Sequence, residues 1–232
     1  MQLYSKLSAL GAVLVVSTAF ASANTIAINS EHGSATGDTV YVSTTATGVI
    51  GTPGTDFALT SVTPTWAPAI GTSEWVGISP NAGPNATINP AKGFYTFQVD
   101  LGSGLAGYSG SIDVLADDTT SVLLNGTQIQ AANPGPGDGD CETGPGITCT
   151  RVFNVGLPGG GAFVNGDNTL TFVVTQAGTG PVNGGGRGDP SGLDFSGSIS
   201  NATPEPSTLL LLGTGLLGSA GAMFRRMRSA TK

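Results

Sequence analysis

The sequence predicts an all-β protein, an antiparallel β-sandwich of jelly-roll-like arrangement, flanked by an N-terminal signal helix and a C-terminal hydrophobic helix. Helical periodicity is nearly absent between the two ends, whereas short runs of alternating apolar and polar residues are frequent there. Glycine and proline supply 37 and 14 of the 232 residues, which is typical of many turns between short strands. Long uncharged apolar stretches occur only near the two ends.

The first of these stretches predicts a secretory signal peptide over residues 1–23. Lys6 precedes an apolar run over residues 7–20, and Ala21-Ser22-Ala23 supplies the small residues of a cleavage site. We therefore expect cleavage after Ala23 and export of the chain that follows. An uncleaved anchor is the alternative, but the run is short for a membrane span.

Residues 24–202 are expected to form one domain, the β-sandwich. This part holds three basic and fourteen acidic residues, a net charge of −11, because the other five bases lie in the two end segments. A nucleic-acid partner is excluded, since phosphate neutralisation needs a basic surface. An acidic surface suits a solvated exported protein and leaves room for divalent cations.

Alternation and turn residues place the strands of this domain. Tyr95, Phe97 and Val99 are expected on the inner face of their strand, and residues 71–92 are expected to form a long irregular connection. Asn125-Gly126 predicts a two-residue hairpin turn, because both central residues of a type I′ turn need positive φ. The expected strands are Thr39–Ala46, Phe57–Val62, Phe94–Leu101, Gly110–Ala116, the hairpin Ser121–Ile129, Thr150–Val155, Thr169–Gln176 and Gly192–Ile199.

Three short motifs in this domain follow one another at turn positions: Ala116-Asp117-Asp118, then Val122-Leu123-Leu124-Asn125-Gly126, then Gly166-Asp167-Asn168-Thr169-Leu170. Together they resemble the galactose-binding-like jelly-roll modules. The resemblance runs from about Phe94 to Ile199 and rests on turn geometry. It implies the sandwich fold and says little about a ligand.

Residues for catalysis are scarce, so we expect no enzyme. His32 is the only histidine, which removes an ordinary Ser-His-Asp triad and leaves neither cysteine with a histidine to activate it. Glycoside hydrolysis, by contrast, needs only a pair of carboxylates. A carboxylate-based glycoside hydrolase is therefore kept as a second alternative function. Its candidate acids are Glu74, Asp113, Asp117 and Asp118; for Asp117 and Asp118, turn chemistry is the preferred interpretation.

A loop rich in glycine, proline and acids carries two further predictions. Cys141 and Cys149 are expected to form one disulfide, because an exported domain meets an oxidising compartment. Asp138, Asp140 and Glu142 alternate along the same loop, a spacing that lets oxygen ligands surround calcium. A solvated acidic loop pinned by the disulfide is the simpler alternative, and no cofactor other than calcium is expected.

Aromatic residues suggest a carbohydrate-binding module as the first alternative function. A glycan site needs exposed rings, and Trp66 and Trp75 are its candidates. Trp66 lies between Pro64 and Pro68 in a loop-like stretch, so it is expected to be exposed. Rings exposed together on one concave surface favour this function, whereas buried rings count against it.

Residues 203–232 predict an anchor. Pro204-Glu205-Pro206 leads into a hydrophobic helix over about 207–224, and Arg225, Arg226 and Arg228 follow it. Eighteen uncharged residues extend ~27 Å as a helix, barely enough for a hydrocarbon core of ~30 Å. A transmembrane helix with its arginines on the cytoplasmic side is therefore expected.

The same segment resembles the PEP-CTERM sorting signal of bacterial exported proteins. The resemblance implies handling by the secretion machinery and an exosortase-type enzyme, with the domain held outside the cytoplasm at the membrane or sorted to the cell surface. It also implies association with exopolysaccharide. The expected function is a non-catalytic component of the envelope or extracellular matrix.

Overall fold

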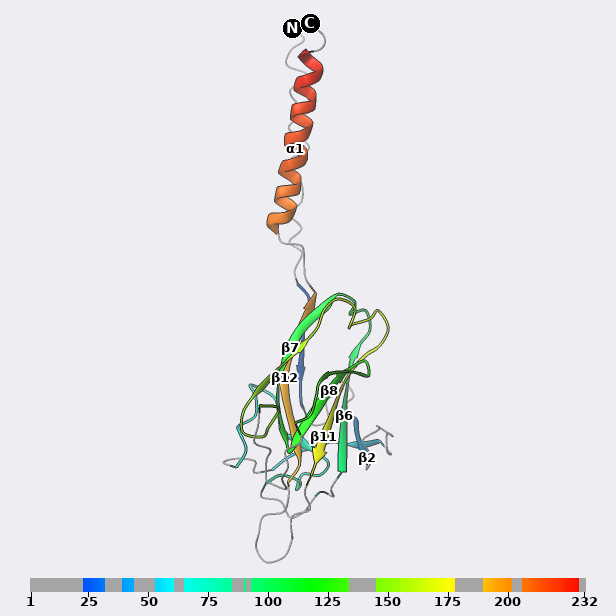
Figure 1. Cartoon of the computed structure of the whole chain (residues 1–232), viewed down its shortest axis with the longest axis vertical. Helices are drawn as coiled ribbons and strands as arrows, with labels where there is room; N and C mark the ends of the chain where they lie inside the picture. The colour runs from blue at the N-terminus through cyan, green and yellow to red at the C-terminus, as the bar shows by residue number, and fades with distance from the viewer. Residues whose placement is uncertain are drawn as a thin grey trace, which may run out of the picture. The chain divides into compact units, whose positions relative to one another are not determined.

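A computed structural model of the chain describes residues 23–31, 39–43, 53–60, 65–84, 90, 93–133, 145–177, 190–201 and 206–229. The chain divides into two compact units, one of Asn24–Ala202 and one of Met1–Ala23 with Thr203–Lys232. The expected signal peptide lies outside the described residues except for Ala23, so the signal helix and its cleavage stay predictions. Figure 1 shows the described elements in colour.

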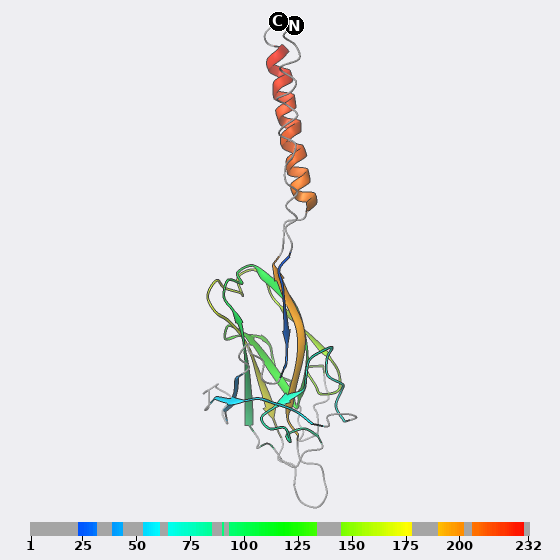
Figure 2. The ribbon, with the colours of Figure 1, turned by 180° about the vertical axis from the view of Figure 1, so that it is seen from behind.

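The described residues of the larger unit form two six-stranded sheets, and every strand pair in them is antiparallel. The first, sheet A, has the order β10 (Phe153–Leu157), β7 (Tyr108–Asp117), β12 (Gly192–Asn201), β5 (Val76–Gly77), β4 (Phe57–Ala58), and β1 (Thr25–Asn29) also pairs with β12. The second, sheet B, has the order β3 (Pro53–Thr55), β2 (Thr39–Ser43), β6 (Gly93–Gly102), β11 (Asn168–Gln176), β8 (Thr119–Leu124), β9 (Thr127–Gln130). Figure 2 shows β1 lying along β12. The prediction of a mainly β protein with two antiparallel sheets is confirmed; the jelly-roll arrangement stays a prediction.

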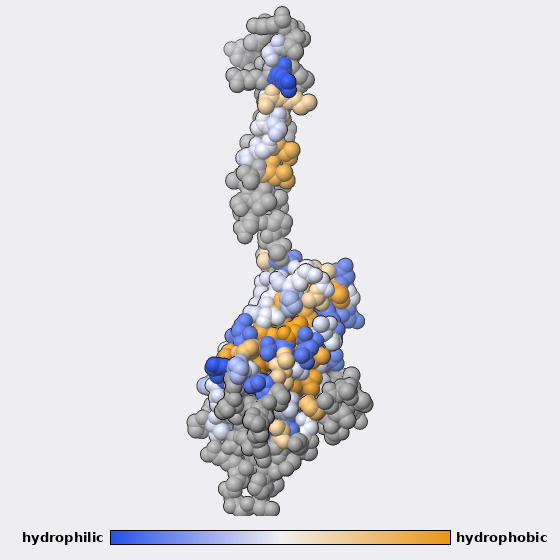
Figure 3. All heavy atoms as spheres, in the orientation of Figure 1, coloured by the Kyte–Doolittle hydropathy of each residue, from blue (hydrophilic) through white to orange (hydrophobic). Residues whose placement is uncertain are grey.

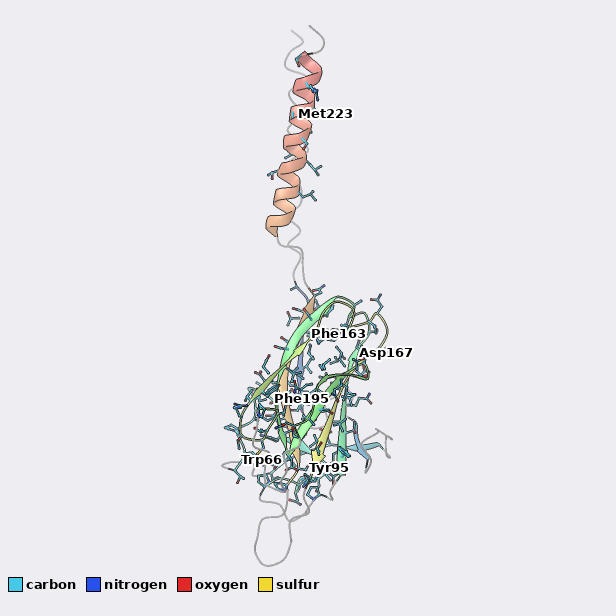
Figure 4. All side chains as sticks on the ribbon, viewed as in Figure 1. Trp66, Tyr95, Phe163, Asp167, Phe195 and Met223 are labelled. Atoms are coloured by element: carbon cyan, nitrogen blue, oxygen red, sulfur yellow. The ribbon has the colours of Figure 1, made fainter. Side chains whose placement is uncertain are left out.

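Alternate side chains of both sheets meet in one apolar core. Phe172 of β11 and Phe195 of β12 stack across it, with ring centroids 4.4 Å apart and an interplanar angle of 22°. Phe195 lies inside the domain in Figure 4. Tyr95 and Phe97 of β6 are also buried, as the alternation of that strand predicts.

The predicted hairpin turn joins β8 to β9. Asn125 has a φ of 51° and Gly126 a φ of 76°, the positive values that a two-residue type I′ turn requires. The Asn125 side chain also holds the turn to a distant part of the chain, because its amide donates to the Ala162 carbonyl and to Asn168 Oδ1 at 2.9 Å each.

Asn168, at the start of β11, is the centre of this corner. Its Oδ1 accepts hydrogen bonds from Asn125 Nδ2 and from the Val164 amide, and its Nδ2 donates to the carbonyls of Gly102, Val164 and Gly166. The side chain is fully buried. It therefore fastens the end of β6, the β8–β9 turn and the loop before β11 to one another.

Several elements differ from the sequence-based expectations. β1 and β3 were not predicted, and β5 lies inside the stretch expected to be irregular. The strand expected from Thr150 begins instead at Phe153, because residues 150 and 151 lie outside the ladder with β7. β1 is short, but it is tied along β12 over all five of its residues. β5 pairs with β12 only between Val76 and Leu193 and with β4 over two residues, and such short contacts have no local sequence signature.

The smaller unit contains one described element, the helix α1 (Pro206–Ser229). A helix was expected over about 207–224, and the observed one continues past the arginines. Pro206 occupies the first helical position, where its missing N–H costs nothing. Among the described residues no helix combines the length and apolarity needed to cross a membrane, which corrects the expectation of a transmembrane helix. Glycine, serine and threonine recur between the leucines of α1 and lower its hydropathy.

Replacing Asn168 by alanine is expected to lower the free energy of unfolding by about 2–3 kcal/mol, because several buried backbone groups lose their partner together. Urea denaturation of the wild-type and Asn168→Ala proteins measures the difference. Asn165→Ala is the matched control, since Asn165 lies in the same loop with an exposed side chain. Equal stability of the two variants would contradict the central role of Asn168.

Candidate functional site

The C-terminal helix exposes apolar side chains. Leu212, Leu216, Leu217 and Met223 are between 59% and 67% exposed, and Arg226 is exposed near the end of α1. Arg225 and Arg228 also belong to this helix, whereas Pro204 and Glu205 lie outside the described residues. α1 thus continues without interruption from Pro206 of the proline motif through the basic cluster.

Residues 202–228 match the PEP-CTERM protein-sorting motif. This PEP-CTERM segment contains Pro204, Glu205, Pro206 and the three arginines expected from the sequence. It indicates an exported protein that an exosortase sorts, at the cell surface or anchored in a membrane. No curated protein and no solved structure gave a significant match to the chain, so the likeness to galactose-binding-like modules is not confirmed.

The two tryptophans of the expected glycan site are buried. Trp66 is 2% exposed and Trp75 is 3% exposed, so the expectation that Trp66 is exposed is wrong. Their ring centroids lie 4.4 Å apart with the planes tilted by 37°, and they contact Leu115 and Cys149. Trp75 Nε1 donates to the Ala67 carbonyl at 3.0 Å. Neither ring offers a platform on which a sugar can stack.

This small cluster covers part of the outer face of sheet A. Leu115 alternates with core residues of β7, so it points away from the main core and into the tryptophan cluster. Gly192 of β12 lies directly beneath it, because a Cβ there would come within 2.9 Å of the Trp66 ring and 2.6 Å of Leu59. The absence of a side chain at Gly192 therefore lets residues 66–75, the covering segment, lie against the sheet.

Asp194 fastens the same covering segment through hydrogen bonds. Ser73 Oγ donates to its Oδ1 at 2.5 Å, Ser30 Oγ to the same atom at 2.9 Å, and the Ile70 amide to Oδ2 at 2.9 Å. Burial raises the pKa of the Asp194 carboxyl above its usual value, and these hydrogen bonds partly oppose that rise. Sequence reasoning missed this residue, although its place between the inward-facing Leu193 and Phe195 puts it on the outer face.

The candidate hydrolase carboxylates occupy different settings. Asp117 and Asp118 are buried, and Asp118 Oδ2 accepts a hydrogen bond from the Ala177 amide at 2.7 Å. Asp113 accepts one from Asn154 Nδ2 at 2.7 Å, and Glu74 is exposed. The partner of Asp118 is distant in sequence, so the expected bonding of the Asp117-Asp118 pair to the local backbone of a turn stays a prediction.

A shallow groove of about 410 Å³ lies where β9 and β10 end the two sheets, lined by Ile129, Gly156, Leu157 and Pro158. None of these residues carries a titratable side chain. Figure 3 shows an apolar patch on the visible face of the domain, bordered by hydrophilic residues. The groove therefore offers apolar contact and no acid or base.

The acidic loop lies outside the described residues, as do Cys141 and the calcium candidates Asp138, Asp140 and Glu142. Elsewhere, in the ranges that are described, no three of His, Cys, Asp and Glu gather as a metal site. Cys149 is fully buried and disulfide-bonded. The pairing with Cys141 and the calcium site stay predictions.

Asp194 is expected to give the domain a pH-dependent stability. The pKa of the Asp194 carboxyl is raised above 3.8 in the folded state. Between 3.8 and this raised value, the native state therefore keeps a proton on Asp194 that the unfolded state has released. The stabilisation from this group is full below 3.8 and is lost as pH rises through the raised value. Urea denaturation across pH should show the wild type losing stability relative to Asp194→Asn as pH rises. Parallel curves would contradict this.

Non-reducing peptide mass analysis of the exported protein is expected to show Cys141 linked to Cys149. Reduction should then weaken the packing of Trp66 and Trp75, because Cys149 contacts their cluster, and the tryptophan fluorescence reports this change. Free thiols at both cysteines would refute the pairing. Cys141→Ser is a matched variant, because it prevents the disulfide while Cys149 keeps its buried place in the tryptophan cluster.

Proposed function

We propose that this chain is an exported, surface-sorted and non-catalytic component of the cell envelope or extracellular matrix, associated with exopolysaccharide. The match of residues 202–228 to the PEP-CTERM protein-sorting motif carries the proposal, because it assigns the chain to export and sorting. The association with exopolysaccharide rests on the resemblance, because bacterial proteins with such sorting signals occur together with exopolysaccharide systems.

The chemistry of the domain supports a non-catalytic role. Its groove is lined by residues without acid or base function. Its net charge of −11 suits a highly solvated surface and disfavours tight binding of anionic polymers. A carbohydrate-binding module that stacks sugars on Trp66 and Trp75 is disfavoured, since both rings are buried.

Removing residues 203–232 is expected to release the domain into the medium of a host that exports the chain and carries an exosortase. The full chain should stay with the envelope fraction. Immunoblots of the medium and envelope fractions measure the distribution. Retention of the truncated chain in the envelope would contradict anchoring by the PEP-CTERM segment.

Glu205→Ala is the matched variant for the same experiment, because it alters the sorting motif while keeping the length of the segment. If an exosortase reads the motif, the variant should escape processing, and intact-mass analysis should detect the retained segment.

A further inference from the structure

The outer face of sheet A is covered over one part and open over the other. The covered part lies around Leu115 and Asp194, under the tryptophan cluster. Further along β12, the outward side chains are Ser196, Ser198 and Ser200, and none of them is buried. In this part β12 pairs with β1 on one side and with β7 on the other, and β7 pairs with β10. We call the open outer face of these four strands the hydroxyl face.

Strand register brings small residues into one row across these four strands. Ala27 of β1 pairs with Ser198 of β12, Ser198 pairs with Ser111 of β7, and Ser111 pairs with Gly156 of β10. Successive residues of a strand point to opposite faces, so all members of the row share the outer face. The row is a band of short side chains that crosses the strands.

Longer polar side chains border this band on one side, where Asn29, Asp113 and Asn154 stand together with Ser196; on the other side Thr25, Ser200 and Ser109 form the neighbouring row. The band of Ala27, Ser198, Ser111 and Gly156, which we call the trough, thus lies below the longer side chains along one border and has the two smallest residues at its ends. Gly156 also lines the groove beside β10, so trough and groove are continuous.

The chemistry of the hydroxyl face points to an uncharged, hydroxyl-rich ligand. The rows contain no cation and one carboxylate, Asp113, which is already bonded to Asn154. Among the described residues, no side-chain hydrogen bond occupies the hydroxyls of Ser109, Ser111, Ser198 or Ser200. An anionic polymer needs basic partners, and protein interfaces favour aromatic or arginine anchors; these rows offer neither.

The spacing of the rows also suits a chain of sugars. Neighbouring strands lie about 4.8 Å apart, close to the length of one sugar residue in many polysaccharides. A polysaccharide lying in the trough thus meets a new strand with nearly every sugar. Serine side chains have few rotamers to lose, so ordering them on binding costs little entropy.

We propose that the hydroxyl face is a binding surface for a neutral polysaccharide, which lies in the trough across β1, β12, β7 and β10. This inference rests on the proposed association with exopolysaccharide and names the surface that performs it. In this proposal, hydrogen bonds from a flat array of hydroxyls bind the polysaccharide, and no aromatic stacking is required. Each contact is weak, so affinity grows with the length of the chain bound.

Affinity electrophoresis of the detergent-solubilised full chain tests the proposal, using gels that contain dextran, hydroxyethyl cellulose or galactan as neutral polymers and polygalacturonate as the acidic one. The wild type is expected to be retarded by at least one neutral polymer and not by the acidic one. Ser198→Lys fills the trough with a long side chain and should weaken the retardation roughly ten-fold.

Thr171→Lys is the matched control. Thr171 lies on the central strand β11 and faces outward from sheet B, so it adds the same charge to the opposite face. It should bind like the wild type, and Ser198→Thr, which keeps the hydroxyl, should bind nearly as well. Thermal unfolding of each variant excludes loss of the fold.

The outcomes separate the two proposals. Equal retardation of wild type and Ser198→Lys overturns the hydroxyl face and leaves the association with polysaccharide standing. Retardation by polygalacturonate alone also overturns the neutral ligand while the association survives. Absence of retardation in every gel overturns both. A dimer in sedimentation that Ser198→Lys abolishes would instead assign the face to a second copy of the chain and overturn the proposal.

Discussion

The stack of Phe172 on Phe195 joins the two sheets at their central strands, and the remainder of the domain depends on it. Each ring belongs to a strand with neighbours on both sides, so the contact holds the middle of sheet B against the middle of sheet A. Aromatic burial of this kind contributes more than its area alone predicts. With the interior closed in this way, chemistry is confined to the surfaces and the ends of the sandwich.

The outer face of sheet A shows how one strand serves two purposes. In β12, Gly192 and Asp194 accept a covering segment, one by lacking a side chain and the other by hydrogen bonding. From Ser196 onward the same strand presents only short polar groups to solvent. The core thus determines only the inward residues of β12. Its outward residues pack against the covering segment at Gly192 and Asp194 and are open to solvent from Ser196 onward.

Much of the fold was predictable from local sequence. The inward rings of β6 and β11 follow from alternation, and the Asn125-Gly126 turn follows from the need for positive φ. The PEP-CTERM segment was predictable because its parts stand in order along the chain. The burial of Trp66 was not, since Leu115 and Cys149, which enclose it together with Trp75, come from distant segments. The hydroxyl face likewise required the register of four strands, which no single stretch of sequence encodes.

The position of β12 has a mechanical consequence. This strand leads directly into the PEP-CTERM segment, and it is held by β7 on one side and by β1 on the other. When the domain is held by its surface and the tether is pulled along β12, the hydrogen bonds of both ladders carry the load together, in shear. Peeling, by contrast, would break them one after another. A domain attached through a central strand is thus suited to resist traction on its tether.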